Sequence, residues 1–93
     1  MAANSAPALN DVTAGELVLL LQQAATLDAT LDAARADGRL AVRPSGNWAP
    51  LIDLTLLDPG LVADFAADPA DLVVLEGMGR GIESNFDADF ACE

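Results

Sequence analysis

Apolar residues recur at helical spacing through the first half of the chain. Leucine and alanine return every three or four positions from Leu17 to Ala34, a period typical of an amphipathic helix. The segment Thr13–Glu16, which reads TAGE, has the form of a capping box, and Gly38 supplies a stop signal at the other end. We therefore predict one helix from about Ala14 to Ala36, preceded by a loop over residues 1–12.

Shorter apolar runs, separated by turn signals, make up the second half. Leu40–Val42 has the composition of a short strand, whereas Trp48–Leu57 fits either a helix or a strand. Asp58-Pro59 predicts a helix start, with the acid as cap and the proline in the first position, and Asp68-Pro69 predicts its end. Leu72–Leu75 is a continuous apolar run with two β-branched valines, of the kind found in strands that are covered on both faces.

The order of these elements predicts an α/β fold with a parallel sheet. A strand as apolar as Leu72–Leu75 needs a neighbour on each side, and this chain offers only one or two short strands. Open edges of that kind pair with another segment or self-associate. We therefore expect the chain to form part of a larger α/β unit, with the rest of that unit or a second copy as its partner.

Charge and composition narrow the possible partners. The 93 residues allow one small domain, and they carry fifteen acids against four arginines, for a net charge of −11. That charge argues against binding to nucleic acid or to an anionic membrane. The run Leu17–Leu21 is too short for a membrane span or a signal-peptide core. The single cysteine, Cys92, excludes an internal disulfide and fits a reducing compartment, so a cytoplasmic location is expected.

The absence of histidine excludes Ser–His and Cys–His catalysis within this chain. A glycine-rich segment, Glu76–Gly81, follows the last apolar run, and ligands of α/β sheets bind beyond the carboxyl ends of strands. Its backbone amides can line an anion site, and Arg80 can add positive charge. The segment lacks both the Walker lysine and the GxGxxG spacing. On spacing alone a plain turn is the simpler interpretation, and a ligand-binding loop is the alternative.

Three further polar positions can have a structural or a functional role. Asn10-Asp11 precedes a helix, where an acid suits the helix dipole, but carboxylate and amide oxygens also suit magnesium or manganese. Ser45-Gly-Asn47 is most simply a turn. Asp53 interrupts an apolar run, and a buried carboxylate there needs a partner, for which Arg80 is a candidate.

Three blocks of sequence carry a likeness to a known family: AANSAPALNDVTAGEL (Ala2–Leu17), SGNWAPLIDLT (Ser45–Thr55) and DLVVLEGMGRGIESN (Asp71–Asn85). With them the chain resembles the metal-dependent damage-control phosphatases, which have an ARMT-like metal-binding domain. The likeness is closest to the branch found in plant enzymes and behind pantothenate-kinase-like domains. It implies a Rossmann-like three-layer α/β/α fold with a parallel sheet, present here only in part. It also implies hydrolysis of small phosphorylated metabolites with a divalent metal, namely manganese, cobalt, nickel or magnesium.

The resemblance also implies which residues form the site. The family's Asn–Asp motif matches Asn10-Asp11, so Asp11 is the expected metal ligand and catalytic residue. The expected contacts to the phosphorylated substrate are Asn10, Glu76, Gly77, Gly79, Arg80 and Gly81. The family's Asp–Asn pair and its lysine have no counterpart in this sequence. Residues 1–93 are therefore expected to be an internal part of the domain, and inactive when isolated.

The substrate stays open between a sugar phosphate and a phosphopantetheine-like compound. Two functions of other classes also stay open. The chain can be a non-catalytic module that binds a phosphorylated ligand, or an inactive truncated product.

Overall fold

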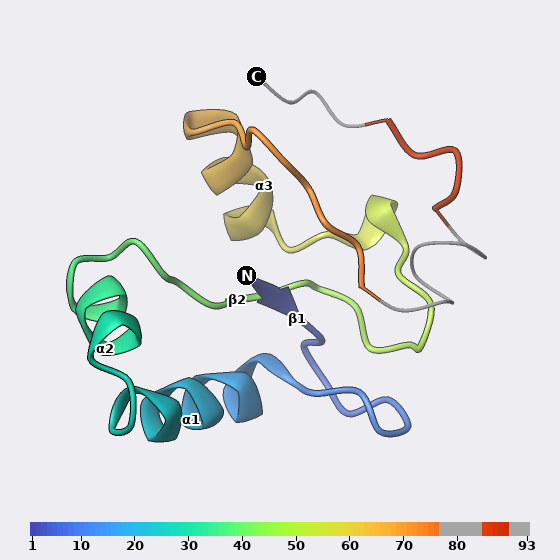
Figure 1. Cartoon of the computed structure of the whole chain (residues 1–93). Coiled ribbons are helices and arrows are strands. Elements are labelled where there is room, and N and C mark those ends of the chain that lie inside the picture. Colours follow the sequence, from blue (N-terminus) through green and yellow to red (C-terminus); the bar gives the residue numbers. More distant parts are fainter. Residues whose placement is uncertain (77–84, 90–93) are drawn as a thin grey trace.

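The computed structural model describes residues 1–76 and 85–89. Its elements are β1 (Ala2–Ala3), α1 (Ala14–Ala25), α2 (Ala29–Ala36), β2 (Arg43–Pro44), the 3-10 helix η1 (Leu54–Leu56) and α3 (Pro59–Ala67). The two strands pair in parallel, with Ala2 opposite Arg43. In Figure 1, α1 and α2 lie on one side of this strand pair and α3 lies on the other. The described part of the chain is therefore α/β, as predicted, with a two-stranded parallel sheet.

The strands do not lie where the sequence placed them. The predicted loop over residues 1–12 is wrong at its start, because β1 occupies Ala2–Ala3, and the strand predicted at Leu40–Val42 lies slightly later, at Arg43–Pro44. The Arg43 amide donates to the Met1 carbonyl at 2.8 Å and the Ser45 amide donates to the Ala3 carbonyl at 2.7 Å. Pro44 falls between these two donors, where its missing N–H costs no bond to β1.

The predicted helix begins and ends as expected but is broken in the middle. Thr13 and Glu16 form the capping box of α1, and Gly38, at φ +74°, follows the end of α2. Between α1 and α2 the Asp28 carboxylate accepts hydrogen bonds from the amides of Thr30 and Leu31, at 2.8 and 3.1 Å. One continuous helix is therefore wrong. An aspartate that can bond to nearby amides competes with the helix and starts a new one.

The capping box predicts that the stability of the fold depends on pH. The Thr13 backbone amide, and then its hydroxyl, donate to Glu16 and lower the pKa of that carboxyl below its ordinary 4.5. A lowered pKa stabilises the fold above the unfolded-state value, and the stability is lost as the pH falls through the folded-state pKa. The helical circular dichroism of the chain should therefore decline below about pH 4.5. Glu16→Gln should decline less over that range, and equal declines would contradict the prediction.

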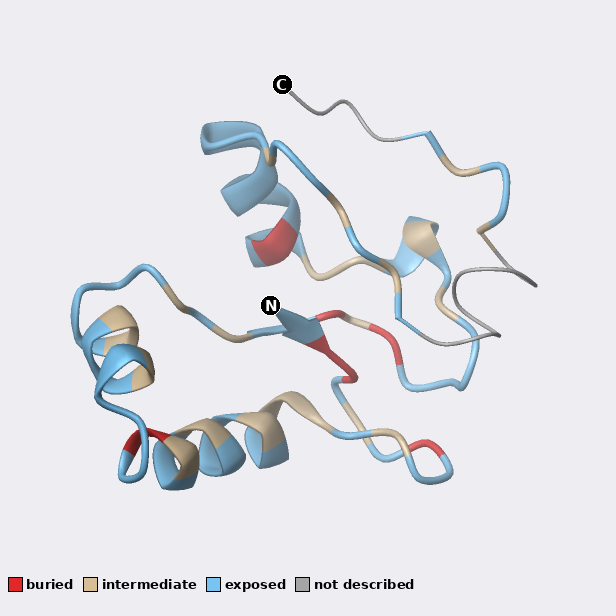
Figure 2. Ribbon diagram, in the orientation of Figure 1, coloured by how far each residue is buried: buried red, intermediate tan, exposed pale blue. Residues whose placement is uncertain are grey.

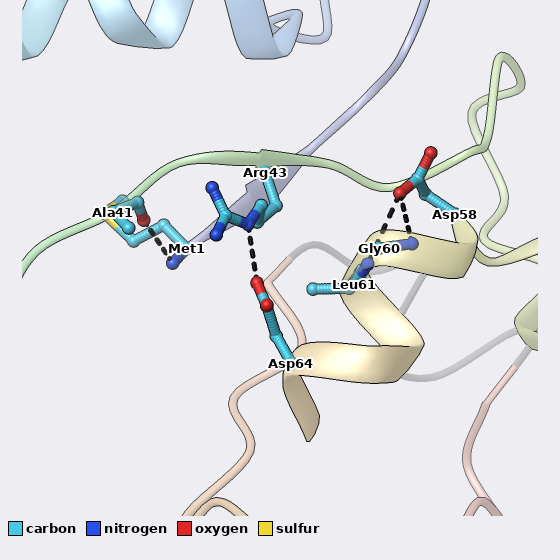
Figure 3. Close-up of polar contacts among 7 residues, drawn as sticks. All are labelled: Met1, Ala41, Arg43, Asp58, Gly60, Leu61 and Asp64. Atoms are coloured by element: carbon cyan, nitrogen blue, oxygen red, sulfur yellow. Dashed lines mark hydrogen bonds and ion pairs between the residues drawn. The ribbon is translucent and has the colours of Figure 1, made fainter. Parts of the chain in front are cut away.

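Helix α3 follows the sequence prediction closely. The Asp58 carboxylate accepts hydrogen bonds from the Gly60 and Leu61 amides, Pro59 holds the first helical position, and Asp68 ends the helix. Figure 3 shows Arg43 on β2 reaching Asp64 on α3, with Nε and Oδ2 2.5 Å apart. Together with the buried Leu61 side chain, this ion pair attaches α3 to the sheet.

The last apolar run does not form the covered strand that its composition predicted. Leu72–Leu75 has no strand assignment, and the side chains of Leu72 and Val74 are 75% and 77% exposed. β-branched residues form a buried strand only where neighbouring strands satisfy their backbone groups. Among the described residues, no strand pairs with this run. The prediction is therefore wrong for the fold as it stands.

The buried residues, red in Figure 2, are mostly small, and several are polar. They are Ala3, Ala8, Ala25 and Leu61 among apolar residues, and Asn4, Ser45 and Asn47 among polar ones. Many large apolar side chains stay exposed, including Leu19, Leu20, Leu27, Trp48 and Phe86. Hydrogen bonds among small residues therefore hold much of the centre together. Within the described ranges, no helix is long and apolar enough to cross a bilayer.

Candidate functional site

The carboxyl ends of the two strands meet in a polar cluster, in which Asn4, Ser45 and Asn47 are buried. Asn4 and Ser5 follow β1, while Ser45, Gly46 and Asn47 follow β2. The Ser5 amide donates to the Asn47 carbonyl at 2.8 Å, and the Gly46 amide donates to the Ser5 hydroxyl at 2.7 Å. We call these five residues the strand-end cluster. It occupies the edge at which α/β sheets bind their ligands.

Asn47 closes the loop that leaves this cluster. Its side chain is 2% exposed. Its Oδ1 accepts the Asp53 amide at 2.7 Å, and its Nδ2 donates to the Asp53 carbonyl at 3.2 Å. Its own backbone amide donates to the Ser45 hydroxyl at 3.1 Å. A buried amide with all its groups bonded fixes its surroundings strongly, so Asn47 holds β2, Ser5 and Asp53 in one arrangement.

A third segment joins the same region through Asn85. Its Nδ2 donates to the Ile52 carbonyl at 3.2 Å, next to the residue that Asn47 holds. The loop of the second sequence block therefore contacts both Ser5 of the first block and Asn85 of the third. The sequence interpretation missed this arrangement, because it treated Ser45-Gly-Asn47 as a plain turn and gave no role to Asn4, Ser5 or Asn85. The available signal was the position of small polar residues directly after strands.

Asp11 lies beside the strand-end cluster. The residue is half-buried, and the Asn4 Nδ2 donates to its Oδ2 at 3.5 Å. A tight turn presents it, in which the Asp11 amide donates to the Ala8 carbonyl at 3.0 Å. Leu9 in this turn has φ +51°, a left-handed conformation that is uncommon for a side chain of its kind. Strained backbone of this sort clusters at functional sites.

Asp11 and Asn10 line a hollow of about 490 Å³ at the start of α1, together with Glu16 and several apolar residues. Among the described residues that line it there is no arginine, so their charge favours a cation over a bare phosphate. A hard cation needs several oxygen ligands, and Asn4 turns its NH₂ group, not its oxygen, toward Asp11. Within residues 1–76 and 85–89, no three acidic or sulfur side chains could hold a metal ion. These residues therefore do not make a metal centre by themselves.

Asp53 has a different role from the one expected. It is exposed, and its Oδ1 accepts hydrogen bonds from the Thr55 amide at 2.8 Å and the Thr55 hydroxyl at 2.6 Å. The hydroxyl bond, followed by the amide bond, lowers the pKa of this carboxyl from its ordinary 3.8. The expected buried carboxylate is therefore wrong: Asp53 caps η1. The proposed pairing with Arg80 involves a residue outside the described ranges.

The predicted phosphate-binding segment is described only at its start. Glu76 is exposed at the end of the first described range. Gly77, Gly79, Arg80 and Gly81 lie outside the described residues. Their predicted role therefore stays a prediction.

Comparison with known proteins identifies the family and several relatives of this chain. The family described as the damage-control phosphatase ARMT1-like domain matches residues 1–93. A damage-control phosphatase of Arabidopsis thaliana is 40% identical over 93 residues, which is all of this chain and 24% of the relative. Pantothenate kinase 2 of the same plant is 41% identical over 114 residues, again all of this chain but 12% of the relative. A 4'-phosphopantetheine phosphatase of Mus musculus is 29% identical over 140 residues, or 17% of its length. The chain thus spans a quarter or less of these relatives.

Proposed function

Because the chain belongs to the damage-control phosphatase family with an ARMT1-like domain, we propose that it is part of a metal-dependent enzyme that hydrolyses a small phosphorylated metabolite. The resemblance drawn from its three blocks is confirmed by the family match. The observation that carries the proposal is the contact between the first two blocks at the carboxyl ends of β1 and β2, beside Asp11, with Asn85 of the third block bonded to Ile52 in the loop that follows. From the name of the mouse relative, a 4'-phosphopantetheine-like compound is the proposed substrate.

Residues 1–93 are proposed to form part of a Rossmann-like three-layer domain. The relatives are at least four times as long as the segment they share with this chain. Exposed apolar side chains on α1 and in the last apolar run, such as Leu19 and Val74, suit contact with further layers of such a domain. The run Leu72–Leu75 would then gain the neighbouring strands that its composition requires.

Asp11 is proposed as one metal ligand and as the catalytic carboxylate of this site. Its half-buried position, its contact with Asn4 and the strained turn before it support this role. The other ligands would come from outside the described residues, since those residues supply too few oxygens. When bound, a divalent ion neutralises charge on phosphoryl oxygens and lowers the pKa of bound water. Manganese, cobalt, nickel and magnesium all accept such oxygen ligands.

The glycine-rich segment is proposed to receive the phosphorylated substrate. Asn10 lies beside Asp11 in the hollow at the start of α1. The remaining proposed contacts are Glu76, Gly77, Gly79, Arg80 and Gly81. Support comes from Asn85, four positions after Gly81, which is tied to the loop of the strand-end cluster. Arg80 would supply the positive charge that the hollow beside Asp11 lacks.

A second candidate function is a module that binds a phosphorylated ligand without hydrolysing it. One observation favours it: the described residues bring no set of metal ligands together. A measurement of phosphate release separates the two functions, since only the enzyme releases phosphate.

We expect a chimera to show the enzymatic activity directly. The chimera is the Arabidopsis damage-control phosphatase with its aligned 93 residues replaced by this chain. It should release phosphate from p-nitrophenyl phosphate and from 4'-phosphopantetheine in the presence of manganese, cobalt or nickel, and a chelator should stop the release. A folded chimera that binds 4'-phosphopantetheine without releasing phosphate, while the parent enzyme is active, would favour the binding module.

A further inference from the structure

Leu9 has a backbone conformation that its side chain disfavours. Its φ is +51°, and among the described residues it is the only one other than glycine with a positive φ. It is the first central residue of the turn from Ala8 to Asp11, which the hydrogen bond from the Asp11 amide to the Ala8 carbonyl closes at 3.0 Å. A turn with a positive φ at this position normally has glycine there, because a side chain crowds the backbone. Leucine at position 9 therefore lowers the stability of the fold.

Packing within the described part of the chain does not offset this loss of stability. A leucine stabilises a fold through the apolar surface that it buries, and Leu9 is 88% exposed. The side chain is therefore presented to something that the described residues do not supply.

The hollow at the start of α1 indicates what Leu9 contacts. Leu9 lines this hollow together with Asn10 and Asp11. The other apolar residues of the lining are Pro7, Val12, Leu19 and Leu20. Ligand sites typically combine an apolar wall with a few polar groups that fix the orientation of the ligand. An apolar wall beside Asp11 suits the carbon atoms of a phosphate ester, whereas the ion and the phosphoryl oxygens suit the carboxylate.

We propose that Leu9 is a substrate-contacting residue, which packs on the carbon atoms next to the phosphate ester while Asp11 binds the ion. The inference rests on the proposed function and adds an apolar contact to its metal and phosphate contacts. Leu9 then favours an ester over free phosphate, since free phosphate has no carbon atom to contact. The strained turn serves binding and not folding.

Leu9→Gly separates binding from folding. Glycine accepts φ +51° without strain. Relief of the strain should outweigh the freedom that glycine adds to the unfolded chain, so the midpoint of urea denaturation of the 93-residue chain should rise. In the chimera the same change should raise KM for p-nitrophenyl phosphate by about tenfold or more, the usual effect of losing the burial of a leucine side chain.

Two other measurements on the Leu9→Gly chimera should stay unchanged. The first is the inhibition constant of inorganic phosphate, which has no carbon atom for Leu9 to contact. The second is the manganese concentration that gives half-maximal activity, because the ion binds at Asp11 and not at Leu9. A substitution that merely disturbed the turn would change both, since the same turn carries Asp11.

Leu27→Gly is the matched control. Leu27 is 90% exposed, as Leu9 is, but it has no positive φ and does not line this hollow. Its replacement should leave KM unchanged and should not raise the urea midpoint. Leu9→Met, which restores an apolar side chain of similar size, should recover most of the lost affinity for the ester.

Four results would overturn the role of Leu9. An unchanged KM in Leu9→Gly would mean that Leu9 does not touch the ester. A lower urea midpoint of the 93-residue chain would mean that the turn is not strained. A lower midpoint of the chimera alone would mean that Leu9 packs against the rest of the domain. Equal losses of affinity for the ester and for inorganic phosphate would mean that the whole site is disturbed.

Failure of this role is distinguishable from failure of the proposed function. If only the role of Leu9 is wrong, the chimera still hydrolyses p-nitrophenyl phosphate, and Leu9→Gly does so with the same KM. If the function is wrong and the chimera binds the ester without releasing phosphate, calorimetry gives the affinity in place of KM. The role of Leu9 then predicts that Leu9→Gly binds the ester about tenfold more weakly than the unmodified chimera, and equal affinities would overturn it. A chimera that neither hydrolyses nor binds the ester would overturn both.

Discussion

Gly46→Ala should lower the free energy of unfolding of the chain by about 3 kcal/mol or more. An added Cβ would lie 2.3 Å from the Leu56 carbonyl oxygen and 2.6 Å from the Asp58 nitrogen. Both are backbone atoms, so no flexible side chain can move aside. The glycine also has φ +87°, which disfavours any residue with a Cβ. Because Gly46 donates to Ser5, the same change should disturb the strand-end cluster.

Urea denaturation followed by circular dichroism measures this effect. Gly15→Ala is the matched control, since a Cβ at Gly15 meets nothing within 4 Å and the position is helical. It should stabilise the chain by about 0.5–1 kcal/mol, because alanine is the better helix former. Equal midpoints for Gly46→Ala and the original chain would mean that the loop after β2 is placed differently.

Asp11→Asn should lower kcat/KM of the chimera by about 100-fold or more. Changes to residues that merely support metal ligands already cost 10- to 100-fold, so loss of a ligand's charge should cost at least as much. The fold should survive, because asparagine has the same size and its oxygen can still accept the hydrogen bond from Asn4. Activity at low manganese should fall more than activity at high manganese, since the change weakens the hold on the ion.

Asp28→Asn is the matched control for Asp11→Asn. It removes one negative charge from the chain, as Asp11→Asn does, but at the cap of α2 and away from the strand-end cluster. It should leave kcat/KM near that of the unmodified chimera. If both variants lost activity equally, the loss at Asp11 would reflect net charge or folding and not a role in the site.

Elements with local signals were predictable from the sequence. The capping box at Thr13 and the Asp58-Pro59 start each lie within a few residues of the helix that they begin. The break at Asp28 was missed because the apolar period continues across it, although aspartate is itself a capping signal. The sheet could not be predicted from the local sequence, since β1 and β2 lie about 40 residues apart and pair through backbone groups. The two alanines of β1 carry no period that marks a strand.

The site was predictable only where a motif carries it. Asp11 could be singled out because an Asn–Asp pair suits a hard cation and matches the family motif. The structure places it beside Asn4, at the end of β1. Asn47 could not be recognised, because its importance comes from hydrogen bonds to Ser5 and Asp53 that no spacing rule predicts. A turn that merely links elements and a turn that holds a site together have the same composition.

The most direct test of the proposed role of Asp11 measures phosphate release from 4'-phosphopantetheine by the chimera at saturating manganese. The unmodified chimera, Asp11→Asn and Asp28→Asn are compared at equal folded concentration. We expect turnover by the unmodified chimera and by Asp28→Asn, and about 100-fold less or none by Asp11→Asn. Full turnover by Asp11→Asn would contradict this role, because this chain would then not contribute its carboxylate to the phosphatase site.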